Sequence, residues 1–114
     1  MQKIIQNEFL ENTKTSKASM QALSKDIEIA SNICINSLKK GGKIFFFGNG
    51  GSAADAQHLA AELVSRYKTE RQGLAAIALT TDTSILTAIG NDYGYERIFT
   101  RQIEALANEG DVAI

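Results

Sequence analysis

The first forty residues carry hydrophobic positions at the spacing of an α-helix. A short apolar stripe at residues 4–9 comes before a polar break at residues 12–16, and Gly41-Gly42 ends the pattern. A longer stripe follows the break at steps of three and four residues. Its members are Leu23, Ile27, Ala30, Cys34 and Leu38. The two stripes predict a helical hairpin over residues 1–40, and its apolar faces suit packing against other copies of the chain.

After Gly42 the pattern changes to short apolar runs separated by helical segments. Ile44–Phe47 is a continuous apolar run rich in phenylalanine, as expected of a strand buried on both faces. Similar runs cover residues 75–79 and 111–114. Between the runs, the periodicity predicts helices over about residues 53–67, 84–89 and 95–108, with a loop at residues 91–94.

The alternation of strands and helices over residues 43–114 predicts an α/β fold with a parallel sheet and right-handed crossovers. Ligands of such sheets bind beyond the carboxyl ends of the strands. The turn after Phe47 and the loop after Leu79 both belong to that edge, which makes them the first candidates for a site. The chain stops inside an apparent strand, and three strands with open edges are a poor end point. We therefore expect a truncated chain that holds the N-terminal part of a single domain.

Composition narrows the class of protein. Of the 114 residues, 44% are hydrophobic and 22% are charged, the formal net charge is −1, and no basic block occurs. Binding to nucleic acid or to a membrane surface is therefore not expected, and no apolar run is long enough to span a bilayer. A single cysteine, Cys34, excludes an internal disulfide framework. We expect a cytoplasmic protein in which the Cys34 side chain belongs to the core.

A glycine-rich turn, Gly48–Ser52 (GNGGS), joins the first strand to the next helix. Glycines remove side chains where the backbone must approach a ligand or adopt a positive φ, and a helix start attracts anions. Ser52 and Asp55 have the spacing of a capping box. Three interpretations stay open. The segment could be an anion site, a tight turn without a ligand, or the dinucleotide fingerprint G-x-G-x-x-A, for which the acidic residue after the second strand comes late, at Asp82.

The helix after the turn carries an imidazole and two carboxylates on one face. Asp55, His58 and Glu62 are spaced by three and four residues, and we expect His58 and Glu62 to project into the pocket onto which the glycine turn opens. Such a pair suits acid–base chemistry, or two ligands of a zinc ion whose other ligands come from elsewhere. The alternative is a solvated face with an ion pair between Glu62 and Arg66. The packing face of the helix consists of Ala56, Leu59, Ala60, Leu63 and Val64.

Two further segments each have a structural and a functional interpretation. Asn91 and Asp92 either form a turn, with Asp92 capping the next helix, or offer polar groups to sugar hydroxyls at the same sheet edge. The basic cluster of Arg66, Lys68 and Arg71 is interpreted as a solvated helix end, where cations suit the helix dipole.

Three segments together resemble the bacterial phosphoheptose isomerases, which are sedoheptulose 7-phosphate isomerases of the sugar isomerase (SIS) fold. The segments are residues 48–67 (GNGGSAADAQHLAAELVSRY), 76–94 (AIALTTDTSILTAIGNDYG) and 99–106 (FTRQIEAL). The similarity extends over essentially the whole chain. It implies a SIS-type, flavodoxin-like sheet and a homotetramer with sites at subunit contacts. It also implies enediol chemistry that converts the ketose to D-glycero-D-manno-heptose 7-phosphate, for ADP-heptose and surface polysaccharides such as lipopolysaccharide.

The resemblance also assigns roles by position. It implies that the substrate-binding residues are Asn49, Gly50, Gly51, Ser52, Glu62, Asn91 and Asp92. His58 and Glu62 correspond to the catalytic pair and to zinc ligands, and Glu62 is the acid–base group. Members of the family continue into a Ser/Thr-rich phosphate loop and a helix that carries a Gln and a second His. The resemblance therefore implies that residues 1–114 alone are inactive and that the remaining zinc ligands lie beyond Ile114.

Two other functions stay open. A non-catalytic SIS domain that senses a sugar phosphate or binds a protein would look similar around the turn, but it would lack a glutamate at the position of Glu62. A dinucleotide-binding oxidoreductase would use residues 48–53 as its phosphate turn.

Overall fold

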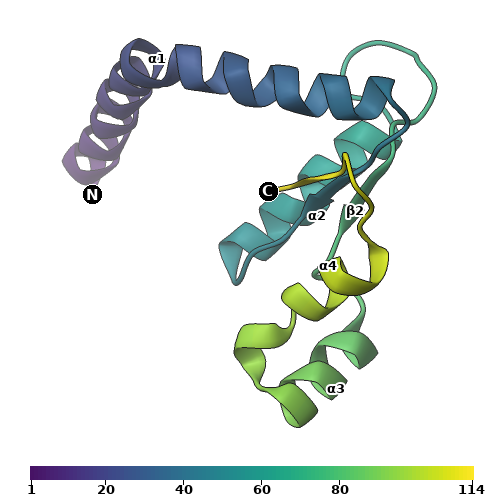
Figure 1. Ribbon diagram of the computed structural model, residues 1–114. Coiled ribbons are helices and arrows are strands. Elements are labelled where there is room, and N and C mark those ends of the chain that lie inside the picture. The colour runs from purple at the N-terminus through teal and green to yellow at the C-terminus, as the bar shows by residue number, and fades with distance from the viewer. The chain divides into compact units, whose positions relative to one another are not determined.

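The computed structural model describes all 114 residues (Figure 1). Its elements are α1 (Gln2–Lys39), β1 (Ile44–Phe46), α2 (Gly51–Val64), β2 (Ala76–Ala78), α3 (Thr83–Tyr93), the 3₁₀ turn η1 (Tyr95–Arg97), α4 (Thr100–Leu106) and β3 (Val112–Ala113). The chain divides into two compact units, Met1–Ile33 and Cys34–Ile114, and the boundary falls inside α1. None of the helices combines the length and the hydropathy that crossing a membrane requires.

The first unit, Met1–Ile33, consists of the greater part of α1. The helix continues without interruption through residues 12–16, so the predicted helical hairpin is wrong. No glycine or proline occurs in α1, and polar residues are tolerated inside a helix where their side chains are solvated or bond to the preceding turn. Thr13 does the latter, because its hydroxyl donates to the carbonyl oxygen of Phe9 at 2.8 Å.

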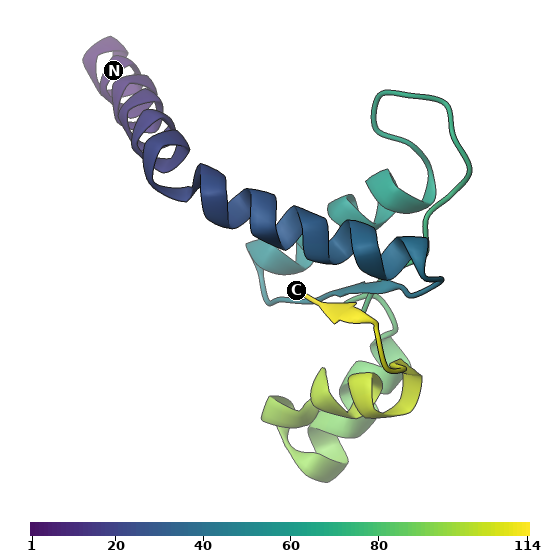
Figure 2. The ribbon, with the colours of Figure 1, turned by 45° about the horizontal axis from the view of Figure 1, so that its top comes forward.

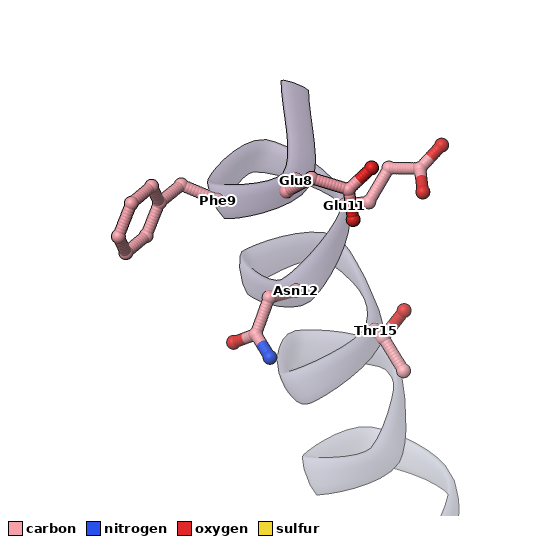
Figure 3. Close-up of a pocket in the computed structure, with 5 residues that line it drawn as sticks. All are labelled: Glu8, Phe9, Glu11, Asn12 and Thr15. Carbon is pink, nitrogen blue, oxygen red and sulfur yellow. The ribbon is translucent and has the colours of Figure 1, made fainter. Parts of the chain in front are cut away.

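The apolar side chains of this first unit are exposed. Phe9 is 73% exposed, and Figure 3 shows it projecting from the helix beside a shallow hollow. All five residues that line the hollow come from α1, so no second wall encloses it. The other large exposed apolar residues of this unit are Met1, Ile4, Ile5, Leu10, Met20, Leu23, Ile27, Ile29 and Ile33.

The second unit, Cys34–Ile114, contains a three-stranded parallel sheet in the order β2-β1-β3, as the alternating pattern predicts. In the register, Ile44 of β1 is opposite both Ala76 of β2 and Val112 of β3. The prediction of a fully buried central strand is confirmed, because Ile44, Phe45 and Phe46 are 2%, 0% and 6% exposed. Since all three strands are parallel, their carboxyl ends meet at one edge of the sheet.

Helices cover both faces of this sheet, with α2 on one side and α3, η1 and α4 on the other (Figure 2). On the α2 side, Ala56 and Ala60 pack against β1, and Cys34 and Leu38 from the last turns of α1 join the same core. On the other side, the buried Gln102 of α4 donates its Nε2 to the carbonyl oxygens of Leu79 and Ile98, at 3.0 and 2.8 Å. The bond to Leu79 connects α4 to the residue that follows β2.

The boundaries of several elements differ from the prediction. α2 ends at Val64 rather than near residue 67, and its Leu59 and Val64 are exposed instead of packed. α3 continues to Tyr93, so the predicted loop at residues 91–94 is wrong. Gly94 ends α3 with a φ of 92°, a conformation that glycine adopts without a side-chain penalty. The helix predicted over residues 95–108 is divided into η1 and α4.

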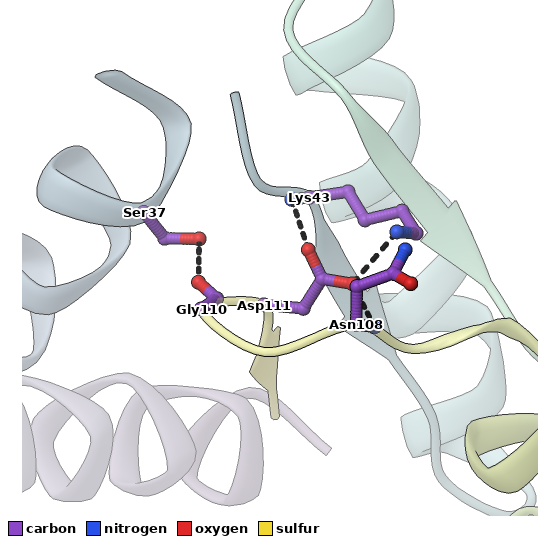
Figure 4. A network of polar contacts seen from close by, with 5 residues as sticks. All are labelled: Ser37, Lys43, Asn108, Gly110 and Asp111. Carbon is purple, nitrogen blue, oxygen red and sulfur yellow. Dashed lines mark hydrogen bonds and ion pairs between the residues drawn. The ribbon is translucent and has the colours of Figure 1, made fainter. Parts of the chain in front are cut away.

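A polar network connects the amino ends of β1 and β3 (Figure 4). The carboxylate of Asp111 accepts the backbone N–H of Lys43 at 2.8 Å and the Lys43 Nζ at 2.7 Å. It also accepts the backbone N–H of Asn108 at 2.8 Å, and the Ser37 hydroxyl donates to the carbonyl oxygen of Gly110 at 2.6 Å. The Lys43 side chain and, next, the Asn108 N–H hold the pKa of Asp111 at about 2. This network lies at the sheet edge opposite to the glycine turn.

Candidate active site

The glycine turn has the positive φ and the close backbone approach that its glycines predict. Gly50 has a φ of 57° and is the N-cap of α2, without a side-chain capping bond. A Cβ on Gly48 would lie 2.6 Å from the Cβ of Ser52, so only glycine allows β1 to end this close to α2. The capping box of Ser52 and Asp55 is wrong, because α2 begins at Gly51 and Ser52 lies inside its first turn.

The backbone amides of this turn are partly used within it. The N–H of Ser52 donates to the carbonyl oxygen of Asn49 at 3.0 Å, and the N–H of Ala53 donates to that of Gly50 at 3.1 Å. The N–H groups of Gly50 and Gly51 donate to no acceptor in the protein. Two adjacent free donors at the positive end of a helix form a site for an anionic oxygen.

A small hollow opens at this carboxyl edge. Thr80, which follows β2, faces the turn across it, so the prediction that both loops share one edge is confirmed. The Tyr95 hydroxyl donates to Asn49 Oδ1 at 2.7 Å across the same hollow. The volume is about 110 Å³, which is below the roughly 300 Å³ of small ligand pockets. The hollow is lined by Gly48, Asn49, Gly50, Ala53, Thr80, Leu86, Tyr95, Ile98 and Phe99.

His58 and Glu62 form a pair on α2 but lie outside this hollow. His58 Nε2 is 3.4 Å from Glu62 Oε1, and the two side chains are 74% and 31% exposed. A second hollow, of about 180 Å³, includes Ser52 and Asp55 in its wall, but neither member of the pair. Neither His58 nor Glu62 lines a hollow at the glycine turn in this chain, and their projection toward the substrate pocket stays a prediction. Asp55 lies about one helical turn before His58 and about two before Glu62, and it reaches this second hollow instead.

The alternative ion pair between Glu62 and Arg66 is also wrong. The Arg66 Nη1 lies 2.6 Å from Glu70 Oε2, and Glu62 has His58 as its partner. The carboxylate of Glu62 therefore remains in the neighbourhood of an imidazole, as the helical spacing predicts.

The His58–Glu62 pair has a separation that a zinc ion would accept. Donors bound at about 2.0–2.2 Å to a tetrahedral ion lie about 3.3–3.6 Å apart, and the two atoms are 3.4 Å apart. No third His, Cys, Asp or Glu of the chain joins them in a cluster. The pair thus fits two ligands of a zinc site, while catalytic zinc sites have about three protein ligands.

Arg71 has a role that the sequence interpretation missed. Its Nη2 donates to the carbonyl oxygen of Glu62 and its Nη1 to that of Leu63, both at 2.8 Å. The last carbonyls of a helix lack partners inside the helix, so the guanidinium caps the turn of α2 that carries Glu62. The predicted placement of Arg71 at the helix end is confirmed, but its guanidinium is partly buried against the carbonyl oxygens rather than solvated. The sequence shows a cation beyond the helix, but not that the chain folds back toward it.

Asn91 and Asp92 lie on the last turn of α3 and are exposed. The Asn91 Nδ2 donates to Asp92 Oδ1 at 2.7 Å, and neither residue lines the hollow. Asp92 caps no helix. Asp82 is the N-cap of α3, because its Oδ1 accepts the backbone N–H of Ile85 at 2.9 Å. This capping role occupies the acidic group that a dinucleotide site would direct to a ribose.

Comparisons with known proteins agree on one family. The SIS domain family matches residues 8–114. A phosphoheptose isomerase of Aliarcobacter butzleri is 59% identical over all 114 residues, which cover 60% of that protein. One from Helicobacter hepaticus is 58% identical over 98% of this chain and 57% of its own length. The chain therefore spans about 60% of the length of these curated relatives.

Solved structures show the same likeness. The structure of phosphoheptose isomerase from Neisseria gonorrhoeae superimposes with a TM-score of 0.90 at 44% identity, over 98% of this chain and 58% of that one. A phosphoheptose isomerase from Francisella tularensis gives 0.87 at 37% identity, over 99% and 60%. The predicted fold class, a parallel-sheet α/β domain of this type, is confirmed.

Proposed function

The chain belongs to the SIS domain family, and we propose that the protein is a phosphoheptose isomerase. It interconverts sedoheptulose 7-phosphate and D-glycero-D-manno-heptose 7-phosphate through an enediol, for ADP-heptose and surface polysaccharides such as lipopolysaccharide. The observation that carries the proposal is the proximity of His58 Nε2 and Glu62 Oε1, 3.4 Å apart on the helix that begins at the glycine turn. Oxygen-binding groups and an acid–base pair thus belong to one rigid element.

The substrate oxygens bind at the glycine turn. The N–H groups of Gly50 and Gly51 support this role, because they donate to no acceptor in the protein. They also lie at the positive end of the helix dipole. The side chains of Asn49 and Ser52 add neutral donors and acceptors for sugar hydroxyls. Asn91 and Asp92 are further contacts of the sugar, as the resemblance implies.

Glu62 moves the proton between adjacent carbons. Its carboxylate takes the proton from C1 of the ketose while the C2 carbonyl oxygen gains one, which gives a 1,2-enediol. Return of a proton to C2, with loss of the O1 proton, leaves an aldehyde at C1. Positioned acid–base groups of this kind contribute about 10²- to 10⁴-fold in rate. His58 Nε2 lies 3.4 Å from the carboxylate and is the second member of the catalytic pair.

Zinc is the cofactor that the donor set suggests. His58 and Glu62 would be two of its ligands, in agreement with their separation. When bound, the ion supplies a Lewis acid that stabilises negative charge on the enediolate oxygens.

The protein is a homotetramer with its sites at subunit contacts, and it works in the cytoplasm. The His58 side chain is 74% exposed, so another surface must cover it before water is excluded from the reaction. The exposed apolar residues of α1 offer a surface on which copies of the chain associate. The cytoplasmic assignment is supported by the unpaired thiol of Cys34.

Glu62→Gln tests the chemistry. In the full-length protein we expect a loss of sedoheptulose 7-phosphate turnover of at least about 10²-fold, with binding of the sugar phosphate retained in calorimetry. Glu70→Gln is the matched control, since Glu70 is an exposed glutamate paired only with Arg66, and its turnover should equal that of the unchanged protein.

The same measurements separate the other functions. A full-length wild-type protein that binds the sugar phosphate without turning it over would be a non-catalytic SIS domain. Saturable binding of NADH, followed by fluorescence, would instead indicate a dinucleotide-binding oxidoreductase. Turnover that survives in Glu62→Gln would remove Glu62 from the mechanism.

A further inference from the structure

A single hydrogen bond closes the wall of the hollow at the glycine turn. The Tyr95 hydroxyl donates to Asn49 Oδ1 at 2.7 Å, although the two residues are 46 positions apart in the chain. Both line the hollow of about 110 Å³. Tyr95 is 65% exposed, so its ring adds little to the core. The hydroxyl contact is therefore the specific interaction that this side chain makes.

The contact decides which way the Asn49 carboxamide faces. A carboxamide has an acceptor oxygen on one side and an NH₂ donor on the other, and its terminal torsion is soft when nothing holds it. With Oδ1 bound to Tyr95, the Nδ2 donor is directed away from Tyr95. No acceptor in the protein binds Nδ2, so this donor is free for an oxygen atom of a ligand.

We propose that Tyr95 is a positioning residue, which acts through Asn49 and presents the Asn49 Nδ2 to a substrate oxygen. Gly94 supports this arrangement, because its φ of 92° ends α3 and directs the chain at Tyr95 back toward the turn. A side chain held in its binding conformation before the ligand arrives loses less entropy on binding. The inference rests on the proposed function insofar as the ligand is a sugar phosphate.

Tyr93 is the natural comparison for Tyr95. It is also exposed, it lies two residues earlier, and its ring contacts the Arg101 guanidinium at 4.8 Å. No hydrogen bond involves its hydroxyl. Phenylalanine in place of either tyrosine removes one oxygen atom and keeps the ring, so both variants should fold equally well.

The test compares Tyr95→Phe with Tyr93→Phe in the full-length protein, first by turnover of sedoheptulose 7-phosphate. We expect Tyr95→Phe to raise KM about 3- to 10-fold with kcat changed by less than about twofold, since orientation of a binding group is lost but not the acid–base pair. Tyr93→Phe should leave both constants unchanged. In the Asn49→Ala background, Tyr95→Phe should add no further effect.

Two results would overturn the inference. If KM and kcat of Tyr95→Phe equal those of the unchanged protein, the hydrogen bond from Tyr95 to Asn49 does not position the carboxamide for binding. Effects that multiply with Asn49→Ala would show that Tyr95 touches the substrate itself.

A second readout does not depend on turnover. The side-chain NH₂ signals of Asn49 in the ¹⁵N spectrum, assigned by their loss in Asn49→Ala, should shift in Tyr95→Phe and stay in place in Tyr93→Phe. If the full-length protein without substitutions lacks isomerase turnover, the proposed function fails, and these signals still decide whether Tyr95 holds the amide. Asn49 NH₂ signals with the same chemical shifts in Tyr95→Phe as in the unchanged protein would contradict the inference directly.

Discussion

Two phenylalanines show how differently the two units of this protein treat the same side chain. Phe45 in the α/β unit is 0% exposed, whereas Phe9 in the Met1–Ile33 unit is 73% exposed. Both follow apolar patterns that predict their secondary structure correctly. In the α/β unit, helices of the same chain cover the strand. In the helical unit, no other element of that unit covers the apolar stripe. Hydrophobic periodicity thus predicts a helix or a strand. Whether the apolar face of that element is buried depends on the other elements that pack against it.

The same difference appears within the candidate site. The glycine turn is completed by its own chain, because Thr80 and Tyr95 form the opposite wall of its hollow. His58 and Glu62 are paired on α2, but no further His, Cys, Asp or Glu of the chain joins them, and the His58 side chain is 74% exposed. On a single helix, side chains four residues apart are neighbours. Burying such a pair requires a second element or another subunit.

The largest expected difference is between the removal of one aromatic ring from the α/β unit and the removal of one from the helical unit. Phe45→Ala should lower the free energy of unfolding by about 3–5 kcal/mol, since it leaves a cavity in the buried strand. Phe9→Ala should change it by less than about 0.5 kcal/mol at a protein concentration where the chain is not assembled. Urea titrations followed by circular dichroism measure both values.

Concentration sharpens this comparison. If copies of the chain cover α1, Phe9→Ala should raise the protein concentration at which the assembly dissociates, as measured by sedimentation. The effect of Phe45→Ala on unfolding should persist at every concentration. A Phe9→Ala variant as destabilised as Phe45→Ala in the unassembled state would contradict the contrast between the units.

An intermediate effect is expected from Arg71, which caps the last turn of α2. Arg71→Gln removes a charged donor from the carbonyl oxygens of Glu62 and Leu63, so the free energy of unfolding should fall by about 1–2 kcal/mol. Arg66→Gln is the matched control, because Arg66 makes only an exposed ion pair with Glu70. That pair should contribute about 0–0.5 kcal/mol. Equal urea midpoints for the two variants would show that the cap does not stabilise the helix.

The smallest expected effect is a change in pH dependence at the Lys43–Asp111 network. The pKa of Asp111 is lowered from 3.8 to about 2, first by the Lys43 side chain. Because the folded pKa lies below the unfolded one, the stability that this carboxylate contributes is present above about pH 4 and lost as the pH falls toward 2. The difference in urea midpoint between the unchanged protein and Asp111→Asn should therefore shrink over this interval. Lys43→Met should weaken the same pH dependence, and a constant difference would contradict the assignment.

Much of the α/β unit could be predicted before its structure was known. The buried run at Ile44–Phe46 and the strand–helix alternation indicate the parallel sheet, which the register confirms. The errors concern polar segments. Residues 12–16 and 91–93 have the composition of turns, but both segments are helical. α1 contains no glycine or proline that would end it, and α3 continues through Gly90 to end at Gly94. Composition alone does not distinguish a solvated helix face from a loop.

The candidate site could be predicted in part. The turn at Gly48–Ser52 and the adjacency of His58 and Glu62 follow from short-range spacing, and both are present. Tyr95 has no such signal, and for Arg71 the sequence shows only a cation beyond the helix. Tyr95 reaches a residue 46 positions away, and Arg71 bonds to backbone carbonyls, which carry no sequence identity at all.

Periodicity, glycine placement and helical spacing are properties of neighbouring residues, so the strands, the glycine turn and the pairing of His58 with Glu62 can be read directly from the amino acids. Burial, enclosure and long-range hydrogen bonds arise only when distant segments meet. The folded chain therefore decided that Asp55 rather than Glu62 reaches a hollow and that Tyr95 holds Asn49. It also decided that Phe45 is covered where Phe9 is not, because each of these depends on the surface that folding brings against the residue.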